Sequence, residues 1–434
     1  MRPALLVVFL LLSGCLRVPD LFRAPDVLAF EAPVAVSSTQ PGAEPVIAVA
    51  PDGTIYVEGI GSNGQGNVNK LFRSDDGRSW SDVTPPALGQ ERSNDGYLAV
   101  DDGGNVYVSN VFSLTLALYK STDEGATWTR LNVPPVPALM HRHWLIPVNG
   151  TLHLTMEAFP PSYAPYLARG PPLPTDLSDR ESGMWYTRSA DGGATWEQPR
   201  QIDPIVNFAG QTNMVTSADG SRLYVGRYQE DGTPPTYTYD DGHWYLLASD
   251  DAGDHWERRE MFDLTSEMST AVPGLALADD GALWLAWSQQ LGNSSIVHLA
   301  GSRDGGRTWS APTTPVGTNG THAMAWARGA PDGAVGLMWY QADVEGTASK
   351  VDASWSVHYA ILDNGTVTSS VRVTPTSVHE GNICAKGPAC AGQEDRSLLD
   401  YPWMDFGKDG TAWLVFPSTQ WERPSAFAVV AHQK

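Results

Sequence analysis

The clearest pattern in the chain is a glycine turn followed by a strand in which apolar and polar positions alternate. Asp-Gly or Asn-Gly between two apolar runs is typical of the tight turn of a β-hairpin. Each copy therefore predicts a pair of antiparallel strands. The pattern occurs at Gly53–Val57, Gly104–Val108, Gly150–Leu154, Gly220–Val225, Gly281–Leu285, Gly333–Leu337 and Gly410–Leu414.

A second repeat, with the pattern S-x-D-x-G-x-T-W, runs in phase with the first. Ser121–Trp128, Ser189–Trp196 and Ser302–Trp309 are complete copies, and Ser249–Trp256 has His in place of Thr. Arg73–Trp80 is a fifth copy, with Arg in the first position.

These octapeptides have the residues of a tight turn between strands. The Asp can accept hydrogen bonds from backbone N–H groups, Gly supplies a positive φ, and Trp can bury its ring in the apolar layer below. We expect a structural role, because one turn would hardly serve as an active site five times. The Asp and Trp residues concerned are Asp75 and Trp80, Asp123 and Trp128, Asp191 and Trp196, Asp251 and Trp256, and Asp304 and Trp309.

Combined, the two repeats give each unit the order strand, glycine turn, strand, loop, strand, octapeptide, strand. That is the layout of a four-stranded propeller blade, so we predict an all-β, seven-bladed β-propeller with octapeptides in blades one to five. Blade six has Asp363–Gly365 at the equivalent turn, and blade seven, from about Leu399, has only three strands. Ala29–Val36 can supply its fourth strand and close the ring.

The octapeptide resembles the Asp-box, or BNR repeat, and the chain resembles sialidases of the neuraminidase superfamily and other Asp-box β-propellers. The resemblance rests on these repeats, which extend over nearly the whole mature chain. It implies an exo-acting glycoside hydrolase with a Tyr nucleophile, a Glu beside it, and arginines that hold the sialate carboxylate. Sialidases have six blades, so a six-bladed ring is the alternative to seven.

The start of the chain indicates export. Arg2 and an apolar run too short to span a bilayer lead to Leu12-Ser13-Gly14-Cys15, which resembles a prokaryotic lipobox. We expect residues 1–14 to be a lipoprotein signal peptide, Cys15 to be lipidated, residues 15–28 to be a linker, and residues 29–434 to form one propeller domain at the cell surface. An ordinary signal peptide is the alternative.

Cys384 and Cys390 are the cysteines that remain if Cys15 is acylated. They lie close together in a Gly/Pro loop, and in an exported protein a disulfide is the plain interpretation. A metal site would need further ligands, and only His379 and Glu380 are nearby. We therefore expect no metal and no other cofactor.

The charge balance restricts the partners. Asp and Glu number 49 against 28 Lys and Arg, which makes nucleic acid an unlikely ligand. No second apolar stretch reaches transmembrane length, so contact with the membrane is expected only through Cys15. We expect a monomer. An anionic substrate would meet an unfavourable overall field and would need a local cluster of Arg.

The candidate site follows by elimination. One face of the ring carries short repeated turns, whereas the other gathers the long loops, where function usually lies. We expect a pocket near the axis on the loop-bearing face, with Arg142, Arg227 and Arg396 forming a positive spot for a carboxylate. The alternative is that each Arg pairs with a local carboxylate, as in Asp395-Arg396. The remaining candidates are Tyr401, Asp395 and Asp400 for catalysis, and Asp95 and Trp144 for substrate binding.

Two functions remain open. The first is an exported exo-glycosidase of the sialidase type that removes terminal sugars from glycans. The second is a non-catalytic propeller that binds a carbohydrate, a glycoprotein or another envelope protein. One fold serves many functions, so the fold alone does not decide between them.

Overall fold

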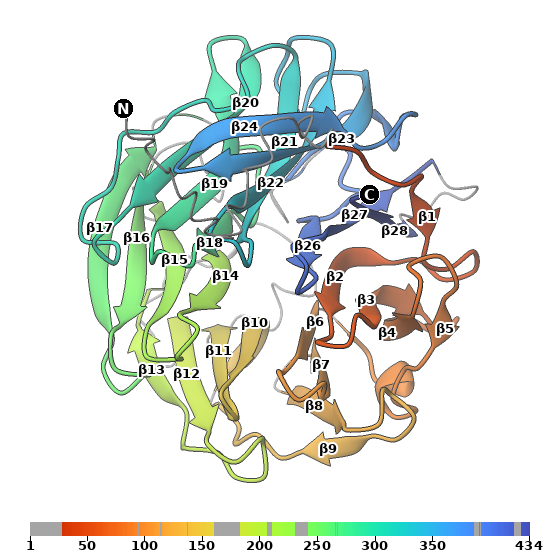
Figure 1. Ribbon diagram of the computed structural model, residues 1–434, viewed down its shortest axis with the longest axis vertical. Coiled ribbons are helices and arrows are strands. Elements are labelled where there is room, and N and C mark those ends of the chain that lie inside the picture. The colour runs from red at the N-terminus through yellow and green to blue at the C-terminus, as the bar shows by residue number, and fades with distance from the viewer. Residues whose placement is uncertain are drawn as a thin grey trace, which may run out of the picture.

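The computed structural model describes residues 28–434 except 94, 113–114, 137, 160–182, 206–210, 231–241, 265, 267, 386–389, 391 and 421–426. These residues form seven separate sheets arranged around a central axis (Figure 1). The predicted seven-bladed propeller is confirmed, and the six-bladed alternative is wrong. Cys15 and the predicted signal peptide lie outside the described residues, so export and lipidation stay predictions.

The first four blades each contain four antiparallel strands, ordered from the axis to the rim. Their bounds are β2 (Ala43–Val49), β3 (Ile55–Ser62), β4 (Asn67–Ser74) and β5 (Ser81–Asp82) in blade one; β6 (Asp95–Val100), β7 (Val106–Phe112), β8 (Thr115–Ser121) and β9 (Thr129–Leu131) in blade two; β10 (Leu139–Val148), β11 (Thr151–Phe159), β12 (Gly183–Ser189) and β13 (Arg200–Asp203) in blade three; β14 (Gln211–Thr216), β15 (Leu223–Glu230), β16 (Gly242–Ser249) and β17 (Glu257–Leu264) in blade four.

The last three blades are less regular. In blade five, the isolated bridge Leu299–Thr313 stands where the others have an outer strand. The bounds are β18 (Gly274–Leu277), β19 (Leu283–Leu291) and β20 (Ser294–Ser302) in blade five; β21 (Thr321–Gly329), β22 (Val335–Ala342), β23 (Ala353–Asp363), β24 (Thr366–Arg372) and β25 (His379–Gly381) in blade six; β26 (Trp403–Phe406), β27 (Ala412–Ser418) and β28 (Phe427–His432) in blade seven. Among the described residues, the 3-10 turn η1 (Leu88–Gln90) is the only helical element, and no helix could cross a membrane.

The ring is closed by the start of the propeller, as predicted. Strand β1 (Val34–Ala35) pairs antiparallel with β28, and Phe30 bridges to Gln433. Blade seven thereby acquires its fourth strand from the other end of the chain. This pairing covers the outer edge of β28, which would otherwise offer unpaired backbone groups to another chain.

The octapeptide turns make the hydrogen bonds that their residue types suggested. In Ser121–Trp128, Asp123 accepts from the Thr127 backbone N–H at 2.8 Å and from its hydroxyl at 2.6 Å. Ser121 Oγ accepts from the Gly125 N–H at 2.8 Å. Asp191, Asp251 and Asp304 make the corresponding bonds. The carboxylate thus satisfies donors within its own turn, in keeping with a structural role.

The first copy is aligned differently from the prediction. Asp76, not Asp75, accepts from the backbone N–H groups of Arg78 and Ser79, at 2.8 and 2.7 Å. Asp75 instead forms an ion pair with Arg73, at 2.8 Å. This turn, Ser74–Trp80, is one residue shorter than Ser121–Trp128, so counting back from the Trp selects the wrong Asp.

The turn tryptophans are half-buried and pack against the hydrophobic core, as predicted. The burial class is the same for all five: Trp80, Trp128, Trp196, Trp256 and Trp309. Trp128, Trp196 and Trp309 donate their indole N–H to the Gly carbonyl of their own turn, at 3.1–3.2 Å. The ring therefore lies between its own turn and the core, and part of it stays in water.

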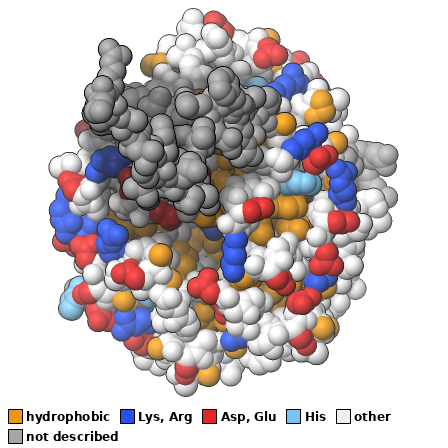
Figure 2. All heavy atoms as spheres, viewed as in Figure 1, with side chains coloured by type: hydrophobic (Ala, Val, Ile, Leu, Met, Phe, Trp, Pro, Cys, Tyr) orange, Lys and Arg blue, Asp and Glu red, His pale blue; other side chains and the backbone are white. Residues whose placement is uncertain are grey.

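Aromatic rings from several blades fill the axis at mid-height. Trp403 lies 4.5 Å from Trp326, 5.7 Å from Trp144 and 5.7 Å from Tyr97, measured between ring centroids. Tyr401 packs against Trp326 at 5.7 Å. We call these five residues the axial aromatic cluster. Figure 2 shows hydrophobic side chains towards the centre of the ring, with charged side chains around the rim and a few close to the centre.

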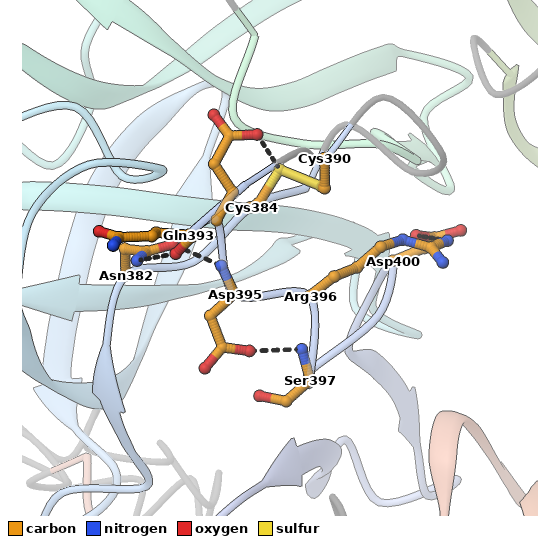
Figure 3. Close-up of a disulfide and its surroundings, with 9 residues drawn as sticks. Asn382, Cys384, Cys390, Gln393, Asp395, Arg396, Ser397 and Asp400 are labelled. Carbon is orange, nitrogen blue, oxygen red and sulfur yellow. Dashed lines mark hydrogen bonds and ion pairs between the residues drawn. A yellow bond between two sulfur atoms is a disulfide. The ribbon is translucent and has the colours of Figure 1, made fainter. Parts of the chain in front are cut away.

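The predicted disulfide is present and joins Cys384 to Cys390 (Figure 3). The loop that it closes is short, so we expect the double substitution Cys384→Ser, Cys390→Ser to lower the free energy of unfolding by about 2–3 kcal/mol. Urea unfolding with and without reductant measures this. Alkylation of both cysteines in the unreduced, folded protein would contradict the bond.

Candidate functional site

Four of the seven innermost strands contain an irregularity in their pairing near the loop-bearing end. The register shifts between Ala43 and Val46, Met140 and His143, Gln211 and Met214, and Ala323 and Trp326. A bulge adds a residue and redirects the neighbouring side chains, and bulges are common beside active sites. Glu44 and Arg142 both lie at such shifts.

Charged side chains meet at this end of the axis. Arg142 Nη2 lies 2.9 Å from Asp400 Oδ2 and 3.6 Å from Asp95 Oδ1, and Arg142 Nη1 lies 3.8 Å from Glu44 Oε2. Arg396 Nη2 binds the other oxygen of Asp400 at 2.9 Å. We call these five residues the axial charge cluster. Four of them are buried, and Arg396 reaches the surface with 35% of its side chain exposed.

The backbone is strained next to two of these acids. Glu44 has φ 47° and Leu399, which precedes Asp400, has φ 56°. Such positive values are uncommon for residues other than Gly, and each costs on the order of 1–3 kcal/mol. Strain of this kind persists where the surrounding structure enforces it, and it often accompanies a functional site.

The pKa values of Glu44 and Asp400 move in opposite directions. Burial, and secondly the charge of Asp400, raise the pKa of Glu44 well above its ordinary value of 4.5. Burial alone would also raise the pKa of Asp400, but Arg396 and Arg142 outweigh it and hold this pKa below 3.8. The opposed shifts favour the protonated form of Glu44 beside the ionised form of Asp400, and Glu44 hydrogen-bonds to Asp400.

A second ionic group lies between blades three and four. Arg227 Nη1 binds Glu157 Oε1 at 3.0 Å, and its Nε lies 3.4 Å from Asp203. Both Arg227 and Glu157 have completely buried side chains. His141 connects this group to the axis, with its ring nitrogens 3.8 Å from Asp95 and 3.8 Å from Glu157.

The structure brings some predicted residues together and separates others. Arg142 and Arg396 converge on Asp400, whereas Arg227 belongs to the second group. Each of these Arg residues is paired with carboxylates, so the three do not form one unpaired positive spot among the described residues. Pairing was the alternative, but the partner of Arg396 is Asp400 rather than the neighbouring Asp395.

Asp395 and Tyr401 do not have the expected catalytic surroundings. Asp395 Oδ1 accepts from the Ser397 N–H at 2.7 Å and shapes its own loop (Figure 3). Tyr401 is buried, with the Arg142 guanidinium 5.1 Å from its ring centroid. Burial raises the pKa of Tyr401 well above its ordinary value of 10, which makes its hydroxyl a weak nucleophile. Trp144 belongs to the axial aromatic cluster.

Sequence reasoning missed Glu44, Glu58, Glu157 and Asp203, all of which are buried. The available signal was an acidic residue inside an otherwise apolar strand, as in Ala43–Val49 and Ile55–Ser62. Burial of an acidic side chain is rare unless it is paired or protonated, so such a residue marks a site.

Glu58 allows a direct test of a buried neutral acid. Burial raises its pKa well above 4.5, and Asn69 donates a hydrogen bond to it. The Glu58 carboxyl makes its full contribution to the free energy of unfolding below pH 4.5. This contribution is lost as the pH rises through the raised pKa of Glu58. We expect Glu58→Gln to match the wild type at pH 4 and to have a higher Tm at pH 8. Equal Tm values at both pH values would contradict a protonated Glu58, and exposed Glu345→Gln is the control.

The axial cavity lies at the other end of the ring. Its volume is about 380 Å³, and its lining includes Asp279 and Pro331 of the glycine turns as well as Arg328 and Asp405. It therefore opens towards the turn-bearing face, whereas the sequence-based prediction concerned a pocket on the loop-bearing face. The axial aromatic cluster separates it from the axial charge cluster, because Tyr97 and Trp403 line the cavity while Tyr401 contacts Arg142.

Comparisons with known proteins bear on the fold alone. No family model and no curated protein matches the chain. A solved protein of unknown function from Dyadobacter fermentans has a TM-score of 0.52 and 15% identity, over 94% of this chain and 99% of its own.

Two carbohydrate-active enzymes are among the other similar structures. A Hadza microbial sialidase has a TM-score of 0.45 and 15% identity, over 90% of this chain and 65% of its own. The GH93 α-L-arabinofuranosidase of Fusarium graminearum has a TM-score of 0.49 and 10% identity, over 93% of this chain and 98% of its own. The similarity to the Dyadobacter fermentans protein shows a shared fold alone.

Proposed function

We propose that this protein acts on glycans at the loop-bearing end of its axis, as a glycoside hydrolase. The observation that carries the proposal is the Glu44–Asp400 pair, whose pKa values diverge within a buried, charged cluster. Opposed pKa values of neighbouring acids are typical of a proton donor beside an ionised partner. The sialidase and arabinofuranosidase among the similar folds are consistent with this class of activity.

Spare hydrogen-bonding capacity in the cluster suits a sugar. Glu44 Oε2, Asp95 Oδ2, and Arg142 Nε and Nη1 are buried and lack hydrogen-bond partners among the described residues. Buried polar atoms without partners are costly, and they often mark the place of a ligand or water. Sugar hydroxyls both donate and accept, so they match this mixture of donors and acceptors.

Each acid then has a distinct role. The Glu44 carboxyl donates its proton to the glycosidic oxygen as the bond from that oxygen to the sugar carbon breaks. Water attacks the same carbon, and Asp95 receives the proton that the water loses. Asp400 remains ionised and holds Arg142 and Arg396 in position.

A panel of p-nitrophenyl glycosides tests the activity, with release of p-nitrophenol as the measurement. We expect turnover of at least one neutral or acidic glycoside by the purified full chain. No release from any substrate would contradict hydrolysis. It would leave the second candidate, a non-catalytic glycan-binding propeller, which the near-complete burial of Glu44, Asp95 and Asp400 favours. Capture on a glycan array would then identify the ligand.

We also propose that the protein is exported and anchored through a lipid on Cys15. The lipobox-like sequence before Cys15 supports this, and so does the Cys384–Cys390 disulfide, because disulfides persist mainly in oxidising compartments. Cys15→Ala should move the protein from the membrane fraction to the soluble fraction of the cells that export it. Unchanged membrane association would contradict the anchor.

A further inference from the structure

A second cavity lies on blade two, and none of its described lining residues belongs to the axial charge cluster. Its volume is about 330 Å³, and it is lined by Glu91, Arg92, Asn110, Phe112 and Ala117. Asn110 pairs across the sheet with Gly96 and Ala117, so these three positions share one face of the blade. A side chain at Gly96 would overlap Glu58 and Asn69, so this face of blade two packs against blade one.

The cavity contains a buried acceptor with an unused lone pair. Asn110 is 2% exposed and its Nδ2 donates to the Arg92 carbonyl at 2.8 Å, which fixes the amide. Its Oδ1 lacks a hydrogen-bond partner among the described residues. A buried amide oxygen of this kind needs a donor, and a hydroxyl of a ligand can supply one.

The two charged residues of this cavity differ in their pairing. Glu91 accepts from the Tyr119 hydroxyl at 3.2 Å and lies 3.4 Å from the Arg130 guanidinium. The guanidinium of Arg92 is exposed and, in the described part of the chain, makes no ion pair. Arg92 thus brings to the cavity a positive charge that no described residue pairs with, in contrast to the paired Arg residues of the axis.

The cavity also offers an apolar surface to a ligand. Phe112 is 38% exposed, one of the few large hydrophobic residues on the described surface with that much exposure. An aromatic ring of this kind can pack against the C–H face of a sugar ring. The volume is at the small end of the range of roughly 300–1,000 Å³ that is usual for small-molecule sites, and it suits a single sugar unit.

We propose that this cavity binds an acidic sugar unit, with a carboxylate or sulfate on Arg92, the sugar ring on Phe112, and a hydroxyl donating to Asn110 Oδ1. The inference rests on the proposed action on glycans and adds a preference for acidic ones. The cavity lies beside β6, the strand that carries Asp95: Asp95 pairs with Val111, next to Asn110. A glycan of several units could therefore extend from the axial end to this cavity.

Isothermal titration calorimetry with free sugars tests the site without requiring turnover. Methyl glucuronide and galactose 6-sulfate should bind, and methyl glucoside should bind at least 10-fold more weakly. Arg92→Gln should remove this difference, and Phe112→Ala should weaken all three sugars. Arg78→Gln, which removes another exposed Arg, should leave binding unchanged. Comparison of the two acidic probes shows whether a carboxylate or a sulfate is preferred.

The outcomes separate this inference from the proposed function. Equal binding of glucuronide and glucoside, or no effect of Arg92→Gln, would overturn the acidic subsite even if the protein hydrolyses glycans. Loss of turnover in Glu44→Gln with unchanged glucuronide binding supports both proposals. Binding of acidic sugars by a protein that hydrolyses nothing would support the subsite and overturn only the hydrolase.

Discussion

Glu44→Gln is expected to lower kcat at least 100-fold for any glycoside that the wild type hydrolyses. Gln has nearly the same shape but cannot donate an acidic proton, and a positioned general acid contributes about 10²–10⁴-fold. The wild-type rate should fall as the pH rises through the raised pKa of Glu44, because the donor form is the protonated one. The pH profile of kcat and the kcat of the variant are the measurements.

The control for this variant is Glu260→Gln, the same substitution at a side chain that is 67% exposed. It should retain the wild-type kcat. The folded fraction of both variants is checked by the urea midpoint, since Gln at position 44 removes a buried acid without creating a cavity. If Glu44→Gln retains wild-type kcat, Glu44 is not the proton donor and the buried pair has a structural role.

Arg227→Met is expected to reduce the free energy of unfolding by about 3–5 kcal/mol. The substitution leaves Glu157 completely buried and Asp203 nearly so, without the cation that compensates them. Removing one partner of a buried ion pair lowers the free energy of unfolding by far more than the intact pair contributes, because the other charge is left unpaired in an apolar environment. Urea unfolding monitored by Trp fluorescence gives the value.

Two further variants identify the cause of that loss. Arg227→Met combined with Glu157→Gln should recover part of the stability, because position 157 then has a neutral amide in place of a buried carboxylate that has lost its cation. Arg307→Met removes an Arg that is 55% exposed and lies 3.0 Å from Asp250, and it should cost only about 0–1 kcal/mol. An equal loss of unfolding free energy in Arg227→Met and Arg307→Met would contradict this explanation, because the buried ion pairs would then contribute no more to stability than an exposed one.

The architecture could be predicted because it depends on local rules repeated along the chain. A glycine turn needs its positive φ wherever it occurs: Gly53 and Gly104, for example, have φ 93° and 78°. Seven copies of one such turn imply seven equivalent sheets, and two unpaired ends imply closure between them. The loop that contains Cys384 and Cys390 is similarly local, and its disulfide followed from spacing.

The candidate site could be predicted only in part, because its partners are distant in sequence. Arg142 binds Asp400 across 258 positions, and the adjacent Asp395 contributes nothing to the pairing of Arg396. An acid in the apolar segment Ala43–Val49 was visible in the sequence, but the bulge at which Glu44 is buried, and so its raised pKa, was not.

The chain alone was therefore sufficient for the all-β class, the number of blades, the closing strand and the disulfide. Each of these follows from residues close in sequence or from a repeated unit. The pairing of charges at the axis, the opposed pKa values of Glu44 and Asp400, and the position of both cavities required the folded ring. They depend on distances between blades and on the loss of water around buried groups, and neither quantity is encoded in any short segment.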